Sequence, residues 1–197
     1  MTILAIDPGT ERTGYALKTV DLADSPRVFT PDGHGTFYGK GTTVKRIADI
    51  AGQVMAMVKE YKVDALVIEE YQMIPGKVSG IYAVPGLISV LTYLWYTKKK
   101  TVPIMVYPAT WKAALCGSAG ASKAVAREGI IRILPHALVK KIDEDYAKRR
   151  GSNTSDEGEQ DCYDAISILY WADRTVRDGY LEESMKIDSK KTKARRK

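Results

Sequence analysis

The fold of this chain is decided near its start, by the stretch Ile3-Leu4-Ala5-Ile6-Asp7-Pro8-Gly9-Thr10. Its four consecutive apolar residues predict a short buried strand over 2–7. The Pro-Gly turn then reverses the chain, and residues 13–18 predict a second strand that completes a hairpin. Asp7 stands at the end of the first strand, where a carboxylate is poorly placed to serve surface solubility.

Beyond the hairpin, strand and helix patterns alternate. Apolar residues recur at helical spacing over 43–61, and the stretch 84–98 is apolar nearly all round the helix that it predicts. We expect further strands at 35–38, 64–69 and 103–107, further helices at 110–115, 122–134 and 162–178, and loops at 75–80 and 148–158. This order predicts an α/β domain with a mixed sheet flanked by helices.

Composition limits the class of protein. The chain has 197 residues, of which 45% are hydrophobic, and this suits one globular domain. No apolar run approaches the roughly 20 residues of a membrane span, and the start of the chain lacks the pattern of a signal peptide. Cys116 and Cys162 have no metal-ligand spacing, so we expect a reducing cytoplasm rather than a disulfide scaffold.

The net charge of +6 is concentrated at the end of the chain. Between Lys186 and Lys197, seven basic residues and one acidic residue carry the whole excess, so the rest is about neutral. We therefore divide the chain into a domain over 1–178 and a basic tail over 179–197, which we expect to be disordered. Such a tail is either a solvated segment or a contact to nucleic acid without sequence preference.

Three further acidic residues share the setting of Asp7. Glu69 ends the apolar run 65–68, and Asp161 and Asp164 lie three residues apart at the predicted start of the last helix. Carboxylates from separate elements converge only if a positive charge holds them, and Mg²⁺ or Mn²⁺ prefers such oxygens. The commonest chemistry at a metal site built only from carboxylates is phosphoryl transfer to or from a nucleic acid.

Each of these acids also has an ordinary structural interpretation. Asp7 before Pro-Gly suits an Asx turn, and two acids in the first turn of a helix are common there. Glu70 rivals Glu69, although Glu69 follows the apolar run directly. The specificity lies in the four acids together.

Four motifs in order resemble those of the RuvC-type Holliday junction resolvases, including relatives encoded by phages. They are Ile3–Thr10 with Thr13–Ala16, then Val67–Glu70, then Trp111–Lys123, and last Asp161–Ala165. The third contains Lys112 and Lys123 at the interval of two functional lysines in that family. Without the resemblance, both would be expected to be ordinary surface lysines.

The resemblance implies an RNase H-like fold with a mixed five-stranded sheet flanked by helices. It implies an endonuclease that resolves four-way and branched DNA by paired symmetric nicks, leaving 5′ phosphates and 3′ hydroxyls. Two Mg²⁺ ions, or Mn²⁺, would be held by Asp7, Glu69, Asp161 and Asp164. Lys112 would act in catalysis and on the substrate, and Lys123 would bind the substrate. The apolar helix at 84–98 would form a homodimer, and the enzyme would work in the cytoplasm, of the host if phage-encoded.

One position departs from the family pattern. Where the family places a base-stacking aromatic residue, this chain has Gln72, and Tyr71 beside it is the candidate substitute. Two alternatives stay open, an RNA-processing nuclease similar to the RuvX type and a junction-binding protein without catalysis. An actin-like ATPase opens with a similar turn, but this chain is too short for its two lobes.

Overall fold

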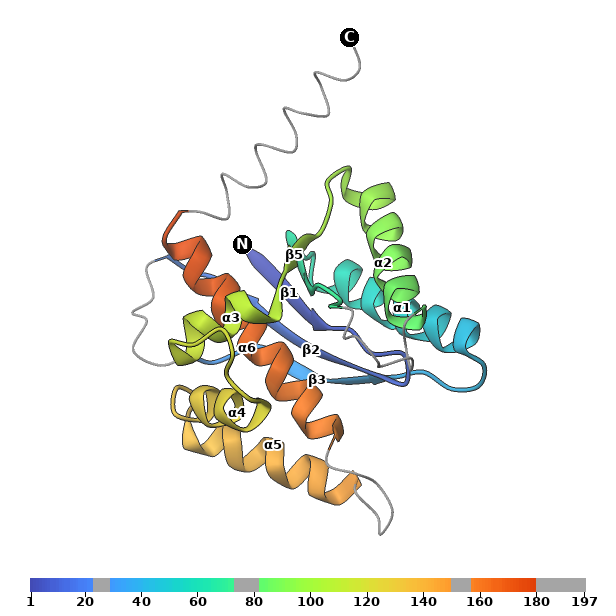
Figure 1. Ribbon diagram of the computed structural model, residues 1–197. Coiled ribbons are helices and arrows are strands. Elements are labelled where there is room, and N and C mark those ends of the chain that lie inside the picture. Colours follow the sequence, from blue (N-terminus) through green and yellow to red (C-terminus); the bar gives the residue numbers. More distant parts are fainter. Residues whose placement is uncertain (23–28, 73–81, 150–156, 180–197) are drawn as a thin grey trace.

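The computed structural model describes residues 1–22, 29–72, 82–149 and 157–179. A central sheet is flanked by helices on both faces (Figure 1). The strands are β1 Thr2–Asp7, β2 Arg12–Thr19, β3 Gly33–Tyr38, β4 Ala65–Glu69 and β5 Ile104–Val106. The helices are α1 Thr43–Glu60, α2 Ala83–Lys99, α3 Pro108–Cys116, α4 Lys123–Ile131, α5 His136–Arg149 and α6 Glu157–Arg177.

The sheet has five strands in the order β3-β2-β1-β4-β5. The first three strands of the chain form antiparallel pairs, with Asp7 opposite Gly14 in the register of β1 and β2. Strands β1, β4 and β5 run parallel, with Ile6 opposite Ile68. The α/β class and the mixed five-stranded sheet are therefore confirmed. The carboxyl ends of three neighbouring strands meet at one edge, where α/β proteins build their sites.

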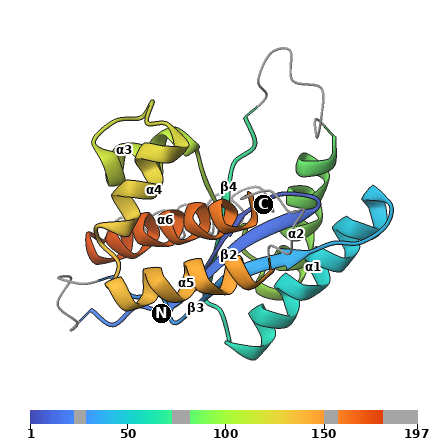
Figure 2. The same ribbon diagram turned by 90° about the horizontal axis from the view of Figure 1, so that it is seen from below.

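Side-chain alternation along the strands creates two cores. In β1, Leu4 and Ile6 pack with α1 and α2 on one face, whereas Ile3 and Ala5 face the other side and pack with α6. Figure 2 shows α6 lying along that second face, with α3, α4 and α5 around it. The odd-numbered residues of β1 thus point toward α6, and Asp7 is the last of them.

One helix was not predicted, and the start of another was placed wrongly. Helix α5, His136–Arg149, lies mostly between the expected helix at 122–134 and the expected loop at 148–158, and its Ile142 and Tyr146 are buried. Helix α6 begins at Glu157 rather than near Cys162, so Asp161 and Asp164 lie beyond its first turn. The charge of the helix terminus falls off within the first turn, so capping does not account for this pair.

Helix α2 is less buried than its composition suggested. Leu87, Leu91 and Trp95 are buried, but Val90 and Tyr93 are 36% and 68% exposed on the outward side. Among the described residues, no helix is both long and apolar enough to cross a membrane. The expected loop at 75–80 and nearly all of the tail lie outside the described residues.

Candidate active site

The first two acids lie side by side at the sheet edge. Asp7 ends β1 and Glu69 ends β4, and these strands are parallel neighbours. Both residues continue the alternation that points Ala5 and Val67 toward α6, so their carboxyl groups share one face. The two groups share a side-chain hydrogen bond, which raises the pKa of Asp7 and lowers that of Glu69. Glu69, rather than Glu70, is thus the neighbour of Asp7. Glu70 instead pairs with the hydroxyl of Tyr107.

A glycine brings α6 to this edge. A Cβ atom at Gly14 of β2 would lie 1.9 Å from the carbonyl oxygen of Asp161, so only glycine allows this approach. Gly14 also stands opposite Asp7 in the register of the hairpin. The helix is thereby pressed onto the sheet at the turn that carries Asp161 and Asp164. Gly14 lies within the opening motif, but no pattern in the sequence predicted this close approach.

The four carboxyl groups influence one another. Burial raises the pKa of Asp7 well above its ordinary value, and the charges of Glu69, Asp164 and Asp161 raise it further. Burial also raises the pKa of Glu69 and of Asp164, and it raises the pKa of Asp161 to about 6. Buried, mutually repelling carboxylates are costly, and such clusters occur preferentially at functional sites. The pKa is therefore raised at all four positions.

Two cationic side chains lie against the acids of α6. Lys123 Nζ, at the start of α4, is 3.3 Å from Oδ2 of Asp164, and Arg12 Nε, at the start of β2, is 3.4 Å from Oδ2 of Asp161. Lys112 on α3 lies 5.5 Å from the ring centroid of Trp111, and its charge lowers the pKa of Asp164 from a greater distance. The structure therefore brings both predicted lysines near the acids, with Lys123 closer.

Sequence reasoning missed two residues of this site. Arg12 was not singled out, although it lies within the opening hairpin. Trp111 is 1% exposed, and its indole N–H donates a 2.9 Å hydrogen bond to Oε1 of Glu69. Its place beside Lys112 in the third motif was the available signal. Tyr71 is half-buried and follows the end of β4 by two residues, at the same edge as Glu69.

The acids fit a divalent cation in type and location. All four supply carboxylate oxygens, the ligands that Mg²⁺ and Mn²⁺ prefer. Within the described ranges, however, no three acidic, histidine or cysteine side chains form a group that could hold a metal ion. Asp161 is turned to Arg12, and Asp164 accepts hydrogen bonds or ion pairs from Gln160 and Lys123. Ion binding therefore requires these side chains to reorient.

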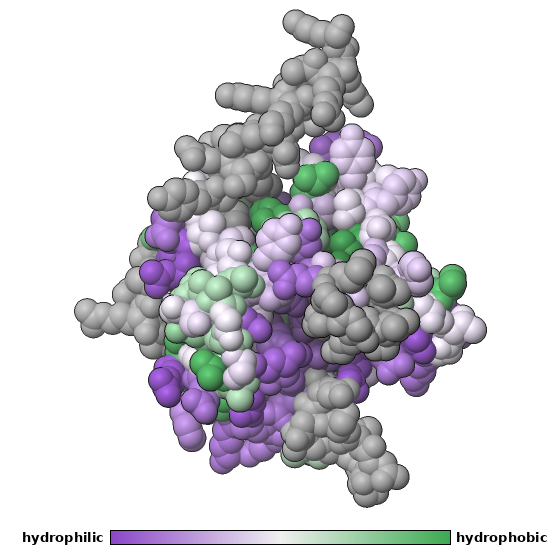
Figure 3. Space-filling model, viewed as in Figure 1, coloured by the Kyte–Doolittle hydropathy of each residue, from purple (hydrophilic) through white to green (hydrophobic). Residues whose placement is uncertain are grey.

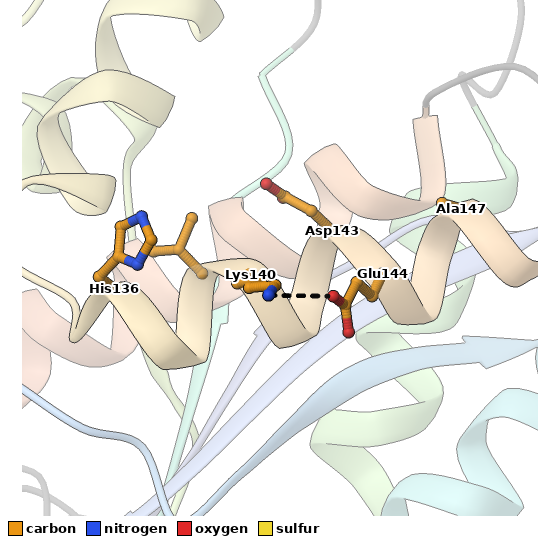
Figure 4. Close-up of a pocket in the computed structure, with 6 residues that line it drawn as sticks. His136, Lys140, Asp143, Glu144 and Ala147 are labelled. Atoms are coloured by element: carbon orange, nitrogen blue, oxygen red, sulfur yellow. Dashed lines mark ion pairs between the residues drawn. The ribbon is translucent and has the colours of Figure 1, made fainter.

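A surface groove of about 390 Å³ lies elsewhere, along α5. Figure 4 shows its lining, which includes a 3.8 Å ion pair between Lys140 and Glu144. All of its lining residues belong to α5, and none of the four acids is among them. The surface over α5 and the start of α6 is mostly hydrophilic (Figure 3). This groove is a solvated helix face and adds nothing to the candidate site.

Comparisons with known proteins cover most of this chain. The sequence model of the family described as crossover junction endodeoxyribonuclease RuvC matches residues 3–147. This match includes Asp7, Glu69, Lys112 and Lys123, but it ends before Asp161 and Asp164. The inclusion of Asp161 and Asp164 in the candidate site therefore depends on where α6 places them, next to Asp7 and Glu69. No curated protein matches the chain significantly in sequence.

Solved structures share the fold at low sequence identity. RuvC of Thermus thermophilus is 17% identical with a TM-score of 0.62, covering 87% of this chain and 95% of its own. The same protein in complex with a Holliday junction substrate is 17% identical with a TM-score of 0.66, and the match covers 91% of this chain and 97% of that chain. The yeast mitochondrial Holliday junction resolvase is 17% identical with a TM-score of 0.59, and the match covers 95% of this chain and 83% of that chain. The RNase H-like resolvase fold is therefore shared.

Proposed function

The chain belongs to the RuvC family of crossover junction endodeoxyribonucleases, and from this premise we propose that it resolves Holliday junctions by hydrolysing DNA phosphodiester bonds. One observation carries the proposal beyond membership of the family. Four carboxyl groups from β1, β4 and α6 converge on one edge of the sheet, and burial raises the pKa of each. A fold that keeps such a costly cluster needs a positive partner for it, and a divalent cation suits it best.

Asp7, Glu69, Asp161 and Asp164 are the residues that would hold two Mg²⁺ or Mn²⁺ ions. When bound, such ions activate water and neutralise the charge that develops on the leaving 3′ oxygen. Water adds to phosphorus while the bond from phosphorus to O3′ breaks, and the products are a 5′ phosphate and a 3′ hydroxyl. Trp111 orients Glu69 for this task, because its hydrogen bond fixes one of the two carboxylate oxygens.

The lysines would hold the DNA backbone. Lys123 already lies 3.3 Å from Asp164, so its ammonium can donate to a phosphate oxygen that enters the site. Lys112, on the preceding helix α3, would supply a second positive charge. That charge would stabilise the negative charge that develops in the reaction or bind a neighbouring phosphate. Tyr71 is the aromatic residue available to stack on a junction base from the end of β4.

A homodimer would match the symmetry of the substrate. Two opposed strands of a four-way junction must be cut, and two copies related by a two-fold axis present two equivalent sites. The outward face of α2 offers exposed apolar surface for this contact, at Val90, Tyr93 and Tyr96. We place the dimer contact there.

The test is cleavage of a labelled synthetic four-way junction, with Mg²⁺ or with chelator, by the wild type and the Asp7→Asn variant. Paired symmetric nicks that ligase reseals are expected only from the wild type in Mg²⁺. Asp7→Asn is expected to keep junction binding, because it removes a cation ligand and one negative charge near the phosphates. The matched control is Asp49→Asn on α1, which lies on the opposite face of the sheet and should cleave like the wild type.

Two outcomes would overturn the proposed activity, and a third would overturn the proposed site. Tight junction binding without nicks in either Mg²⁺ or Mn²⁺ would indicate a binding protein. Cleavage of structured RNA in preference to the junction would indicate an RNA-processing nuclease. Full activity of Asp7→Asn would remove the assignment of this site.

A further inference from the structure

Both acids contributed by α6 are already matched with cations of the chain itself. Oδ2 of Asp161 lies 3.4 Å from Nε of Arg12, and Oδ2 of Asp164 lies 3.3 Å from Nζ of Lys123. Lys123 belongs to the proposed DNA-binding set, whereas nothing in the proposed reaction uses Arg12. Arg12 thus places a guanidinium beside Asp161, one of the four proposed cation ligands.

The fold directs Arg12 to this position. Side chains of β2 alternate, and Gly14 and Ala16 face α6, so Arg12 is on the same face as Asp7. Gly14 lets α6 approach the sheet at Asp161. Arg12, two residues earlier on the same face of β2, lies nearer the start of α6. A Cβ atom added at Gly158 of α6 would lie 3.6 Å from Cδ of Arg12, so the stem of the arginine packs against that first turn.

The contact between Arg12 and Asp161 is partly screened from water. Their side chains are 26% and 20% exposed, so the ion pair is weakened less by solvent than a pair on the open surface. The ion pair holds one oxygen of Asp161 toward β2. It also places the positive charge of Arg12 next to an oxygen that would otherwise be available to a divalent cation. This arrangement agrees with the finding that, in the described residues, no three candidate ligands meet in a metal-binding group.

We propose that Arg12 competes with the divalent cation for Asp161, so that the cation takes this ligand only when the guanidinium moves away. The inference rests on the proposed function, because it takes the four acids as the cation site. Arg12 is a positioning residue in this scheme, since it acts through Asp161. The competition makes the site bind its cation more weakly than the four carboxylates alone would.

The experiment is calorimetric titration of the purified full-length protein with Mn²⁺ alone, without DNA. The variant is Arg12→Met, which keeps the aliphatic stem against Gly158 and removes the charge. It is expected to bind Mn²⁺ about two- to fivefold more tightly than the wild type, which is the range for loss of a partly exposed ion pair. The matched control is Arg132→Met, which removes an equal charge from an exposed pair with Glu128 on α4 and should leave the affinity unchanged.

The outcomes separate this inference from the proposed function. If the wild type binds Mn²⁺, Asp7→Asn abolishes the binding and Arg12→Met leaves it equal or weaker, the role of Arg12 is wrong while the site stands. If neither the wild type nor Arg12→Met binds Mn²⁺, the cation site itself fails, and the inference fails with it. Arg12→Gln provides a second neutral variant should the methionine substitution not fold, with the same expected gain in affinity.

Discussion

Trp111 donates its indole N–H to Oε1 of Glu69 at 2.9 Å and thereby joins α3 to the end of β4. The ring is 1% exposed, so water cannot replace the donor. Burial raises the pKa of Glu69, and the hydrogen bonds from Asp7 and Trp111 lower it. Trp111 therefore helps to keep Glu69 ionised and turned in one direction, as a cation ligand must be.

We predict that Trp111→Phe lowers the apparent affinity for Mg²⁺ by about ten- to a hundredfold, the usual effect of losing a group that orients a metal ligand. The measurement is the Mg²⁺ dependence of junction cleavage. The matched control is Trp95→Phe, because Trp95 is also 1% exposed and also loses an indole hydrogen bond, to Thr101, on the other face of the sheet. Equal Mg²⁺ dependence of the two variants would refute this role of Trp111.

The metal-free protein should become less stable as the pH rises. Burial, together with Glu69 and Asp164, raises the pKa of Asp7, so the native state holds a proton that the unfolded chain releases above about pH 4. Stability is therefore lost from about pH 4 upward until the raised native pKa is passed. Asp161, with a pKa of about 6, contributes a loss between about pH 4 and 6.

Asp7→Asn removes this cost, so we predict a higher Tm than the wild type at pH 7.5 in chelator. The gain should be roughly 2–4 °C for each kcal/mol of repulsion relieved, and it should vanish near pH 3.5. The order should reverse in Mg²⁺, because the wild type gains more from cation binding. Thermal unfolding followed across this pH range measures all three effects, and a lower Tm of the variant at pH 7.5 in chelator would count against the prediction.

Lys123 and Lys112 should differ in their effect on the reaction. Lys123 contacts Asp164, whereas Lys112 lies over the ring of Trp111 and reaches the acids only through its charge. We predict that Lys123→Met lowers kcat by about 10²–10³-fold, because its ammonium lies against the acids where a phosphate oxygen would enter, and that Lys112→Met costs less because its charge acts from farther away. Single-turnover cleavage rates measure this order, and a larger loss at Lys112 would reverse the assignment.

The dimer should depend on the outward face of α2. Tyr93 is 68% exposed there, and Tyr93→Asp places a charge where we propose that two copies meet. We expect monomers in sedimentation and single, unpaired nicks in junction DNA. The control is Leu22→Asp, also 68% exposed, just after β2, which should stay dimeric. A dimeric Tyr93→Asp protein would move the interface elsewhere.

The sequence predicted the strands of the sheet better than the acid-bearing helix. Buried apolar runs and the Pro-Gly turn mark β1, β2 and β4 directly, so the positions of Asp7 and Glu69 followed from local pattern. The start of α6 was predicted too late. Its first turn, which begins at Glu157, is polar and therefore resembles the polar loop before it in sequence. Helix α5 was missed for the same reason, since its apolar residues are outnumbered by charged ones.

The partners of the acids were beyond sequence reasoning. Arg12 and Asp161, or Trp111 and Glu69, meet only through the packing of separate elements on one face of the sheet. No spacing rule joins such positions. The close approach that requires Gly14 likewise depends on where α6 crosses β2, which is a property of the assembled fold.

Arg127 joins its own helix, α4, to α5 and α6. Its guanidinium pairs with Glu159 of α6 and with Asp143 of α5 at 3.4 Å, and it lies 4.8 Å from the ring centroid of Tyr163. Tyr163 in turn donates a 2.8 Å hydrogen bond to Asp143. Since α4 begins with Lys123, this cluster also fixes the helix that delivers that lysine to Asp164.

We predict that Arg127→Met lowers the free energy of unfolding by about 2–3 kcal/mol, because the Glu159 side chain, 8% exposed, loses a cationic partner. This loss of unfolding free energy is smaller than the loss expected on breaking a fully buried ion pair, because the Arg127 side chain is 35% exposed. Urea unfolding in chelator measures it. Arg132→Met on the same helix breaks only an exposed pair with Glu128 and should cost no more than about 0.5 kcal/mol. Equal midpoints for the two variants would show that Arg127 does not join these helices energetically.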